Sequence, residues 1–254
     1  MTTISTTTTP SSSSYIAIVR HAKRYDQHGG DNTYNGYDTP ILKSMENFEL
    51  IQNAANKLKK YQCKIIISSP FKRCFETAVG MALELKINVI KIDNRLGEVM
   101  YQVRKYTNFI KEEDFVYCNM DEYKSILKEA TNNNNTNEGK NIDIIWLNPT
   151  INKPSINETI DEFTKRTDML LDIVKEHEVN NNMMQKQQSQ DNIIDQSNNN
   201  IIVVSHADYL SSWLQKLDQT HVYAPNECGF VVLNTNNMDK TITIEEKFRI
   251  EQIM

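Results

Sequence analysis

The sequence predicts an α/β protein, a three-layer α/β/α sandwich with a mostly parallel sheet. Short apolar runs rich in β-branched residues stand at 15–19, 63–68 and 201–205. Such runs are too short for helices and are typical of strands covered on both faces. Segments with apolar residues three and four apart lie between them, as amphipathic helices require. Five or six strands interleaved with helices favour one sheet with helices on both sides.

The elements can be placed along the chain from these patterns. Strands are expected at 15–20, 63–68, 87–92, 201–205, 229–233 and 241–245, the last two forming a hairpin. Helices are expected at about 43–60, 70–85, 156–178 and 209–217. The first helix carries an apolar face made of Met45, Phe48, Ile51, Ala54, Ala55 and Leu58. The segment 142–147 fits either a short strand or an apolar lid.

Two predicted helices begin with capping signals. Ser69 can cap the helix after the second strand, and Pro70 suits its first turn. Ser155 and Glu158 have the spacing of a capping box, which predicts a helix that extends to about Glu178.

Length and composition indicate one folded domain. The chain has 254 residues, of which 39% are hydrophobic, enough for one core once the polar tracts are set aside. We expect a disordered Ser/Thr-rich tail over residues 1–14 and a single domain over 15–254. Asn/Gln-rich insertions are expected in this domain at about 131–140 and 180–200.

Charge and apolar content exclude several classes of protein. A formal net charge of −5 argues against binding to nucleic acid or to anionic membranes, which depends on cationic contacts to phosphate. No apolar run approaches the roughly 18 residues of a membrane span, and residues 1–14 lack a secretory pattern. The four cysteines show no C-x-x-C spacing, which argues against structural zinc or disulfides. We expect a cytoplasmic protein, with the nucleus as the alternative.

Polar groups follow three of the predicted strands. They are Arg20, His21 and Arg24, then Ser68, Ser69 and Arg73, and finally Ser205 and His206. Because carboxyl ends of parallel strands meet at one edge of a sheet, two imidazoles and three guanidiniums can share one pocket. These cations repel one another unless an anion lies among them, so we expect a phosphate group there. Arg73 in a first helical turn also favours an anion nearby; alternatively, it pairs with Glu76 or Glu84.

Five short motifs occur in a fixed order along the chain. They are RHAKR at 20–24, DTPIL at 38–42, SSPFKRCFETA at 68–78, LGE at 96–98 and VSHAD at 204–208. Together they resemble the histidine phosphatase superfamily, the phosphoglycerate mutase-like proteins. The resemblance covers nearly all of the chain outside the tail and the inserts, and it implies a phosphoglycerate mutase-like fold.

The resemblance implies catalytic roles for His21, Glu98 and His206. His21 would take the phosphoryl group as nucleophile, which suits an imidazole that is neutral near pH 7. Glu98 would protonate the leaving oxygen and later activate water. Asp208 is an alternative acid, although it can equally cap the helix that follows. The phosphate oxygens would be bound by Arg20, Arg24, Arg73 and His206.

The activity that the resemblance implies is phosphomonoester hydrolysis through a phosphohistidine, with neither metal nor cofactor. Mutases typically carry Ser followed by Trp-Asn where this chain has Arg24-Tyr25-Asp26, which favours a phosphatase over a mutase-type phosphotransferase. A phosphate-binding domain without turnover is the third reading. The substrate is expected to be a phosphorylated small molecule or a phosphotyrosine-like group, with Tyr25, Tyr34 and Tyr37 near the pocket. A homodimer is compatible with the sequence.

Overall fold

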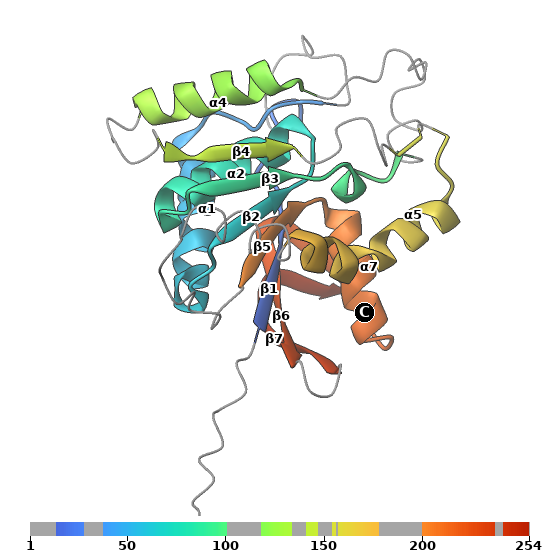
Figure 1. Cartoon of the computed structure of the whole chain (residues 1–254). Coiled ribbons are helices and arrows are strands. Elements are labelled where there is room, and N and C mark those ends of the chain that lie inside the picture. Colours follow the sequence, from blue (N-terminus) through green and yellow to red (C-terminus); the bar gives the residue numbers. More distant parts are fainter. Residues whose placement is uncertain are drawn as a thin grey trace, which may run out of the picture.

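A seven-stranded sheet forms the centre of the protein (Figure 1). The structure is a computed structural model, and it describes residues 14–27, 38–100, 118–133, 141–146, 154–155, 157–177, 200–236 and 241–253. The strands are β1 (Ser14–Arg20), β2 (Ile65–Ser68), β3 (Val89–Ile92), β4 (Asp143–Trp146), β5 (Ile201–Ser205), β6 (Val222–Asn236) and β7 (Thr241–Ile253). Their order in the sheet is β4-β3-β2-β5-β1-β6-β7. The first five are parallel and β6 and β7 are antiparallel, so the predicted α/β fold with a mostly parallel sheet is confirmed.

Helices cover both faces of this sheet (Figure 1). They are α1 (Met45–Leu58), α2 (Lys72–Leu85), α4 (Met120–Asn133), α5 (Ile160–Asp168) and α7 (Ala207–Leu217), with short 3₁₀ turns η1 (Lys59–Tyr61) and η2 (Asn94–Leu96). In β1, Ala17 and Val19 pack into the cluster that holds α1, α2 and α4. Ile16 and Ile18 pack into the opposite cluster, which holds α5 and α7. Strand alternation therefore gives the sheet two apolar faces and the fold three layers.

The registers bring the carboxyl ends of the central strands together. In the β1–β5 pair Arg20 lies opposite Ser205, and in the β2–β5 pair Ser68 lies opposite Val204. The ladder continues one residue further, because His21 N donates to Ser205 O at 3.0 Å and Ser69 N donates to Val204 O at 2.9 Å. Because β5 lies between β1 and β2, His206, which follows β5, has His21 on one side and Ser69 on the other.

Segment 142–147, which the sequence left open, contains the edge strand β4, parallel to β3. The predicted hairpin is present as β6 and β7, although both strands extend beyond the predicted bounds. The expected tail lies outside the described residues up to residue 13, and Ser14 already belongs to β1. The insertion expected at 180–200 lies outside them except for Asn200, and the one at 131–140 overlaps them only where α4 extends to Asn133.

The predicted apolar face of α1 was wrong at its first turn. Met45 is 74% exposed and Phe48 is 46% exposed, whereas Ile51 and Leu58 are buried. The buried residue of the first turn is Asn47. Its Oδ1 accepts from Lys23 N at 2.9 Å and its Nδ2 donates to Leu42 O at 2.8 Å, so this amide faces loops rather than the apolar core.

Both predicted helix caps were also wrong. The N-cap of α2 is Phe71, because the Ser69 hydroxyl is engaged elsewhere, and Asp38 accepts from Lys72 N at 2.6 Å instead. The capping box of α5 is formed by Thr159 and Glu162, one turn later than predicted. The carboxylate of Glu158 forms an ion pair with Arg166 and is not available for a cap.

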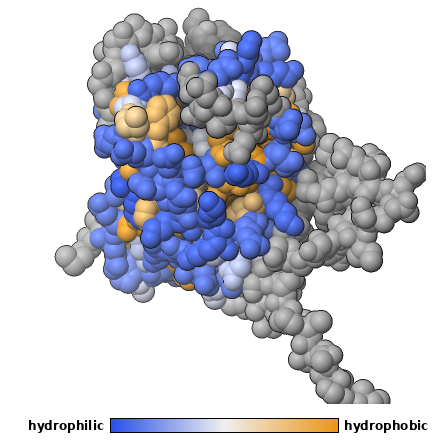
Figure 2. All heavy atoms as spheres, turned by 90° about the vertical axis from the view of Figure 1, so that its left-hand side faces the viewer, coloured by the Kyte–Doolittle hydropathy of each residue, from blue (hydrophilic) through white to orange (hydrophobic). Residues whose placement is uncertain are grey.

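The face seen in Figure 2 is mostly hydrophilic, with apolar residues in separate small groups. Among the described residues, no helix is both long enough and apolar enough to cross a membrane.

Candidate active site

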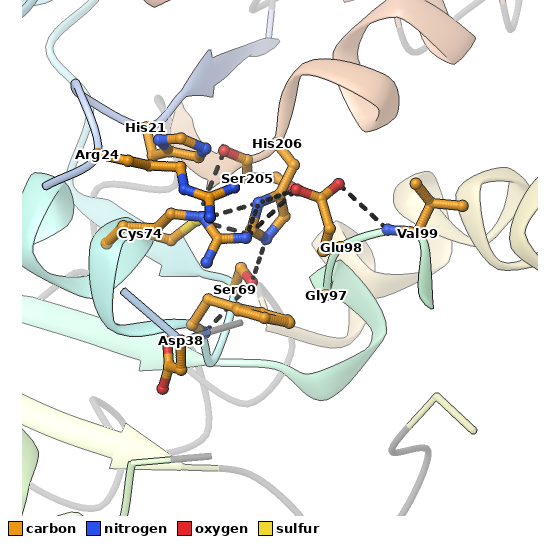
Figure 3. Close-up of polar contacts among 12 residues, drawn as sticks. His21, Arg24, Asp38, Ser69, Cys74, Gly97, Glu98, Val99, Ser205 and His206 are labelled. Carbon is orange, nitrogen blue, oxygen red and sulfur yellow. Dashed lines mark hydrogen bonds and ion pairs between the residues drawn. The ribbon is translucent and has the colours of Figure 1, made fainter. Parts of the chain in front are cut away.

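His21, Ser69 and His206 each follow a strand end and meet at the carboxyl edge of the sheet (Figure 3). The imidazole rings of His21 and His206 face each other edge-on, with their centroids 5.4 Å apart. Arg73, from the first turn of α2, and Glu98, two residues after η2, complete the group. The structure thus brings together four of the predicted site residues: His21, Arg73, Glu98 and His206.

The tautomer of His21 follows from its hydrogen bond. Nδ1 lies 2.7 Å from the carbonyl oxygen of Ala22, and since a carbonyl only accepts, Nδ1 carries the proton. The lone pair is therefore on Nε2. Burial lowers the pKa of His21 well below its ordinary value, and Arg73, His206 and Arg20 lower it further, against the bond to Ala22. The ring is neutral at pH 7, which is the form a nucleophile needs.

The ring of His206 is fully buried and is held at both nitrogens (Figure 3). Nδ1 lies 3.0 Å from Glu98 Oε2, which can only accept, and 3.3 Å from Arg73 Nη2, which can only donate. The shorter contact, to the carboxylate, favours the proton on Nδ1. Ser69 then donates its hydroxyl to Nε2, with Oγ 2.9 Å away. Burial lowers the pKa of His206 to about 4. The negative charge of Glu98 raises this pKa, and the positive charge of Arg73 opposes the effect of Glu98.

Arg73 is buried beside the carboxylate of Glu98. Its side chain is 1% exposed, its guanidinium lies over the ring of Phe71, and Nη2 is 3.3 Å from Glu98 Oε2. The alternative pairing of Arg73 with Glu76 or Glu84 was wrong, because Glu76 bonds Lys43 and Ile41 N, and Glu84 accepts from Gln52 Nε2. Burial alone would raise the pKa of Glu98, but His206 and Arg73 more than offset it and hold it below its usual range. The carboxylate thus lies against two groups that were predicted to bind phosphate.

The other two predicted phosphate ligands, Arg20 and Arg24, each have an acidic partner of their own. Arg20 donates Nη1 to Pro225 O at 2.7 Å and pairs with Glu227, Nη2 to Oε1 being 3.4 Å. Arg24 lies beside His21 in Figure 3 and makes a two-bond contact to Asp26, at 3.0 and 2.7 Å. Burial and the charge of Arg73 lower the pKa of Arg24, while Asp26 opposes the change.

Asp208, the alternative acid, lies in the first turn of α7, whose N-cap is His206. The expectation that Asp208 caps this helix was therefore wrong, although a first-turn carboxylate still favours the helix dipole. Burial raises the pKa of Asp208 to about 6, Glu98 raises it too, and Arg20 opposes the change. Two carboxyl groups with pKa values moved in opposite directions thus lie near the two histidines.

The sequence did not reveal the side chains that hold the site residues in place, those of Asp38 and Thr77. Asp38 supplies the anion at the start of α2 that Lys72 and Arg73 had suggested, and burial raises the pKa of Asp38 to about 6. The hydroxyl of Thr77 accepts from Ala22 N at 3.0 Å and donates to Arg73 O at 2.8 Å. Asp38 and Thr77 both belong to motifs that the sequence shows. The sequence gives the order of these motifs but not the contacts that the two residues make. Tyr34 and Tyr37 lie outside the described residues.

The group has donor types that a metal could use. Ligand atoms of His21, Glu98 and His206 lie within 4.8 Å of one another, and two histidines with one carboxylate suit several divalent metals. The guanidinium of Arg73 lies against the same carboxylate and carries a fixed positive charge. Its charge opposes a cation at this position and favours an anion.

A known protein family matches part of this chain by sequence. Residues 16–116, which include His21, Arg73 and Glu98, match the family model described as histidine phosphatase superfamily (branch 1). The predicted resemblance to the histidine phosphatase superfamily is confirmed. The match ends before His206, whose place beside His21 is known from the sheet register. No curated protein matches the chain by sequence.

Several solved structures share the fold of this chain at low sequence identity. The ecdysone phosphate phosphatase from Bombix mori, in complex with tungstate, has a TM-score of 0.55 at 17% identity, covering 91% of this chain and 92% of its own. A phosphoglycerate mutase from Bacillus anthracis has a TM-score of 0.52 at 16% identity, covering 93% of both chains. A putative alpha-ribazole-5'-P phosphatase from Escherichia coli has a TM-score of 0.52 at 15% identity, covering 92% and 96%. Phosphatases and a mutase thus share the fold, which does not choose between them.

Proposed function

We propose that this protein is a metal-independent phosphomonoesterase that acts through a phosphohistidine on His21. The observation that carries the proposal is the tautomer of His21: Nδ1 is bound to the carbonyl of Ala22, which leaves a lone pair on Nε2 of a buried, neutral ring. A buried guanidinium, Arg73, lies in the same group of residues. A neutral imidazole beside fixed positive charge suits attack on a phosphate ester.

The carboxylate of Glu98 acts as the anion of the ligand-free site. It accepts from His206 and Arg73, the two groups that would bind phosphoryl oxygens. A phosphate ester that takes these donors displaces the carboxylate and places its own negative charge beside it. Both changes raise the pKa of Glu98, so substrate binding moves the group toward the protonated form that a general acid needs.

Hydrolysis of the ester then proceeds in two steps. The Nε2 lone pair of His21 attacks phosphorus, the bond from phosphorus to the ester oxygen breaks, and Glu98 gives its proton to that oxygen. In the second step a water attacks the phosphohistidine, the N–P bond breaks, and the water's proton returns to the carboxylate. Arg73 and His206 stabilise the charge on the transferred group in both steps. Arg20 and Arg24 contribute further positive charge.

Asp208 is the second candidate for the acid. Its pKa of about 6 lies closer to neutral pH than that of Glu98 in the ligand-free site. Glu98 is favoured because its Oε2 is 3.0 Å from His206, directly at the proposed phosphate position. For Asp208 only the electrostatic influence of Glu98 and Arg20 ties it to the site.

The substrate is proposed to be a phosphorylated small molecule or a phosphotyrosine-like group. A cavity of about 360 Å³ is lined by Tyr25 and Lys72, which are adjacent in sequence to Arg24 and Arg73, and by Glu76, Glu122 and Glu129. The aromatic ring of Tyr25 in this cavity is the feature that suits a flat leaving group. We place this activity in the cytoplasm, in keeping with the free thiols of Cys74 and Cys118.

The deciding experiment incubates the protein with an aryl phosphate in the presence of a chelator, and measures phosphate release and acid-labile phosphohistidine. We expect turnover and labelling in the wild type, and neither in His21→Ala, with a loss of at least about 10⁴-fold. Stable labelling without hydrolysis would indicate a mutase-type phosphotransferase. A requirement for a divalent metal, or phosphate binding without labelling or turnover, would overturn the proposal.

A further inference from the structure

Glu98 lies on a turn whose backbone is bound mainly by side chains. The turn follows β3 and spans residues 95–100, of which only the first two belong to η2. The carbonyl oxygens of Arg95, Gly97 and Glu98 all accept hydrogen bonds from one buried side chain, that of Arg166 in α5. A turn bound in this way keeps its shape only while that side chain stays in place.

The guanidinium of Arg166 uses all five of its N–H groups. Nη1 donates to Arg95 O at 2.9 Å and to Gly97 O at 2.7 Å, and Nη2 donates to Glu98 O at 2.9 Å. Nε and the second proton of Nη2 donate to the two oxygens of Glu158, each at 2.7 Å. Such a fork of five donors in fixed directions is available to arginine and not to lysine.

Glu158 binds the side of the Arg166 guanidinium that does not contact the carbonyls. It is buried, it neutralises Arg166, and its Oε2 also accepts from Met100 N at 3.2 Å. A buried ion pair is weak evidence for a role in stability, since apolar residues of similar volume often do as well. Here the pair contacts the backbone on both sides of Glu98, at residues 97, 98 and 100, which points to a role in geometry.

The same turn is tied to the residue that precedes His206. The hydroxyl of Ser205 donates to Leu96 O at 2.8 Å. One end of the turn is thus fixed to the strand end that carries His206, while Arg166 and Glu158 fix the remainder. Together these contacts set the 3.0 Å separation between Glu98 Oε2 and His206 Nδ1.

We propose that Arg166, with its partner Glu158, is the positioning residue of the active site that sets where the Glu98 carboxyl group lies. The inference rests on the proposed function, in which Glu98 is the acid. Arg166 does not contact the reacting atoms, and it acts through the carbonyls of the turn. A displacement of about 1 Å at a catalytic group can lower a rate by about 10²-fold.

Arg166→Lys tests this without removing charge. The positive charge of Arg166 itself contributes to the low pKa of His206, so a neutral replacement would mix two effects. Lysine keeps the charge but cannot bond three carbonyls and a carboxylate from one plane. We expect kcat/KM on an alkyl phosphate, a poor leaving group, to fall by about 10- to 100-fold. On an activated aryl phosphate, which needs little help from an acid, kcat/KM should fall by less than about 3-fold, because kcat/KM reports the transfer to His21 and not the later hydrolysis of the phosphohistidine.

A second readout does not depend on activity. In the wild type, Glu98 holds the proton of His206 on Nδ1, which the ¹⁵N shifts of the ring report at pH 7. In Arg166→Lys, withdrawal of Glu98 should move these shifts toward a mixture of the two tautomers. Glu158→Gln keeps the donors to the three carbonyls and loses one contact in the pair, so it should change both readouts in the same direction and by less. This variant serves if Arg166→Lys does not fold.

Two control variants separate the positioning role of Arg166 from the general effect of a substitution nearby. Arg95→Lys disrupts a neighbouring buried guanidinium that bonds Asp93 and Glu176 rather than the backbone of the turn. Lys165→Gln removes an exposed charge next to Arg166 in sequence. Neither should produce the selective loss on the alkyl phosphate. Equal losses on both substrates with unchanged ¹⁵N shifts would overturn the positioning role. If the wild type hydrolyses neither ester, the proposed function fails, and the ¹⁵N comparison still decides whether Arg166 positions Glu98.

Discussion

His21, Ser69 and His206 stand on three strand ends whose backbone groups continue the hydrogen bonds of the sheet, whereas Glu98 stands on a turn that is bound by Arg166, Glu158 and Ser205. In the first region the fold itself fixes the side chains, because parallel strands in register bring their ends to one edge. In the second region the geometry depends on a few buried polar side chains from distant parts of the chain. The proposed nucleophile, His21, and one proposed phosphate ligand, His206, are therefore positioned by the sheet, whereas the proposed acid, Glu98, is held by contacts of its own.

The largest expected effect concerns Glu98→Gln. With the carboxyl group gone, kcat/KM on an alkyl phosphate should fall by about 10²- to 10⁴-fold, as loss of a general acid does. The change in kcat/KM on an activated aryl phosphate should be much smaller, because kcat/KM reports the transfer to His21 and not the later hydrolysis step. Because the amide carries no charge, Arg73 and His206 lose the anion that competes with phosphate. Inorganic phosphate should therefore inhibit the variant several-fold more strongly, which steady-state kinetics can measure.

Asp208→Asn is the matched variant for this prediction. It also removes a carboxyl group near the site, and it leaves the contacts of Glu98 with Arg73 and His206 in place. We expect phosphate inhibition close to that of the wild type. If Asp208→Asn shows the dependence on leaving group and Glu98→Gln does not, the acid is Asp208 and the two regions differ less than we infer.

The same contrast explains what could be predicted from the sequence. His21, Ser69 and His206 follow apolar runs, so topology alone brings them together, and periodicity was enough to place them. Arg166 lies in α5 and Glu158 lies just before it, 58 or more residues after the turn they hold, and no local pattern marks a side chain that bonds distant backbone groups. Ser155 and Glu158 even had the spacing of a capping box, and only the fold shows that Glu158 faces Arg166.

A smaller effect, on stability, is expected within the strand-end region. Asn47 is a buried amide that bonds Lys23 N, Lys23 O and Leu42 O, and so holds the loop that carries Arg24. Asn47→Ala should lower the free energy of unfolding by about 1–3 kcal/mol, because the backbone groups it leaves are shielded from water. Asn53→Ala, an exposed change of the same type in α1, should alter it by less than about 0.5 kcal/mol. Urea unfolding compares the two, and equal effects would show that the Asn47 contacts contribute nothing specific.

The smallest expected effect is on how steeply the free energy of unfolding changes with pH. This effect tests the environment of Asp208. A carboxyl group whose pKa is raised to about 6 holds a proton that the unfolded chain releases, so it stabilises the fold as pH falls from about 6 to 4. His21 and His206 act in the opposite direction, because burial lowers the pKa of each and stability is lost as pH falls below about 6.5.

In Asp208→Asn the loss from the histidines is no longer offset by this carboxyl group. Stability should then fall more steeply than in the wild type between pH 6 and 4, by up to about 1 kcal/mol per pH unit. Asp161→Asn removes an exposed first-turn carboxylate of α5 and serves as the control, with a curve parallel to the wild type. A parallel curve for Asp208→Asn as well would mean that this carboxyl group titrates like one in water, and it would then lose its claim to be the acid, leaving Glu98 and the turn that Arg166 holds.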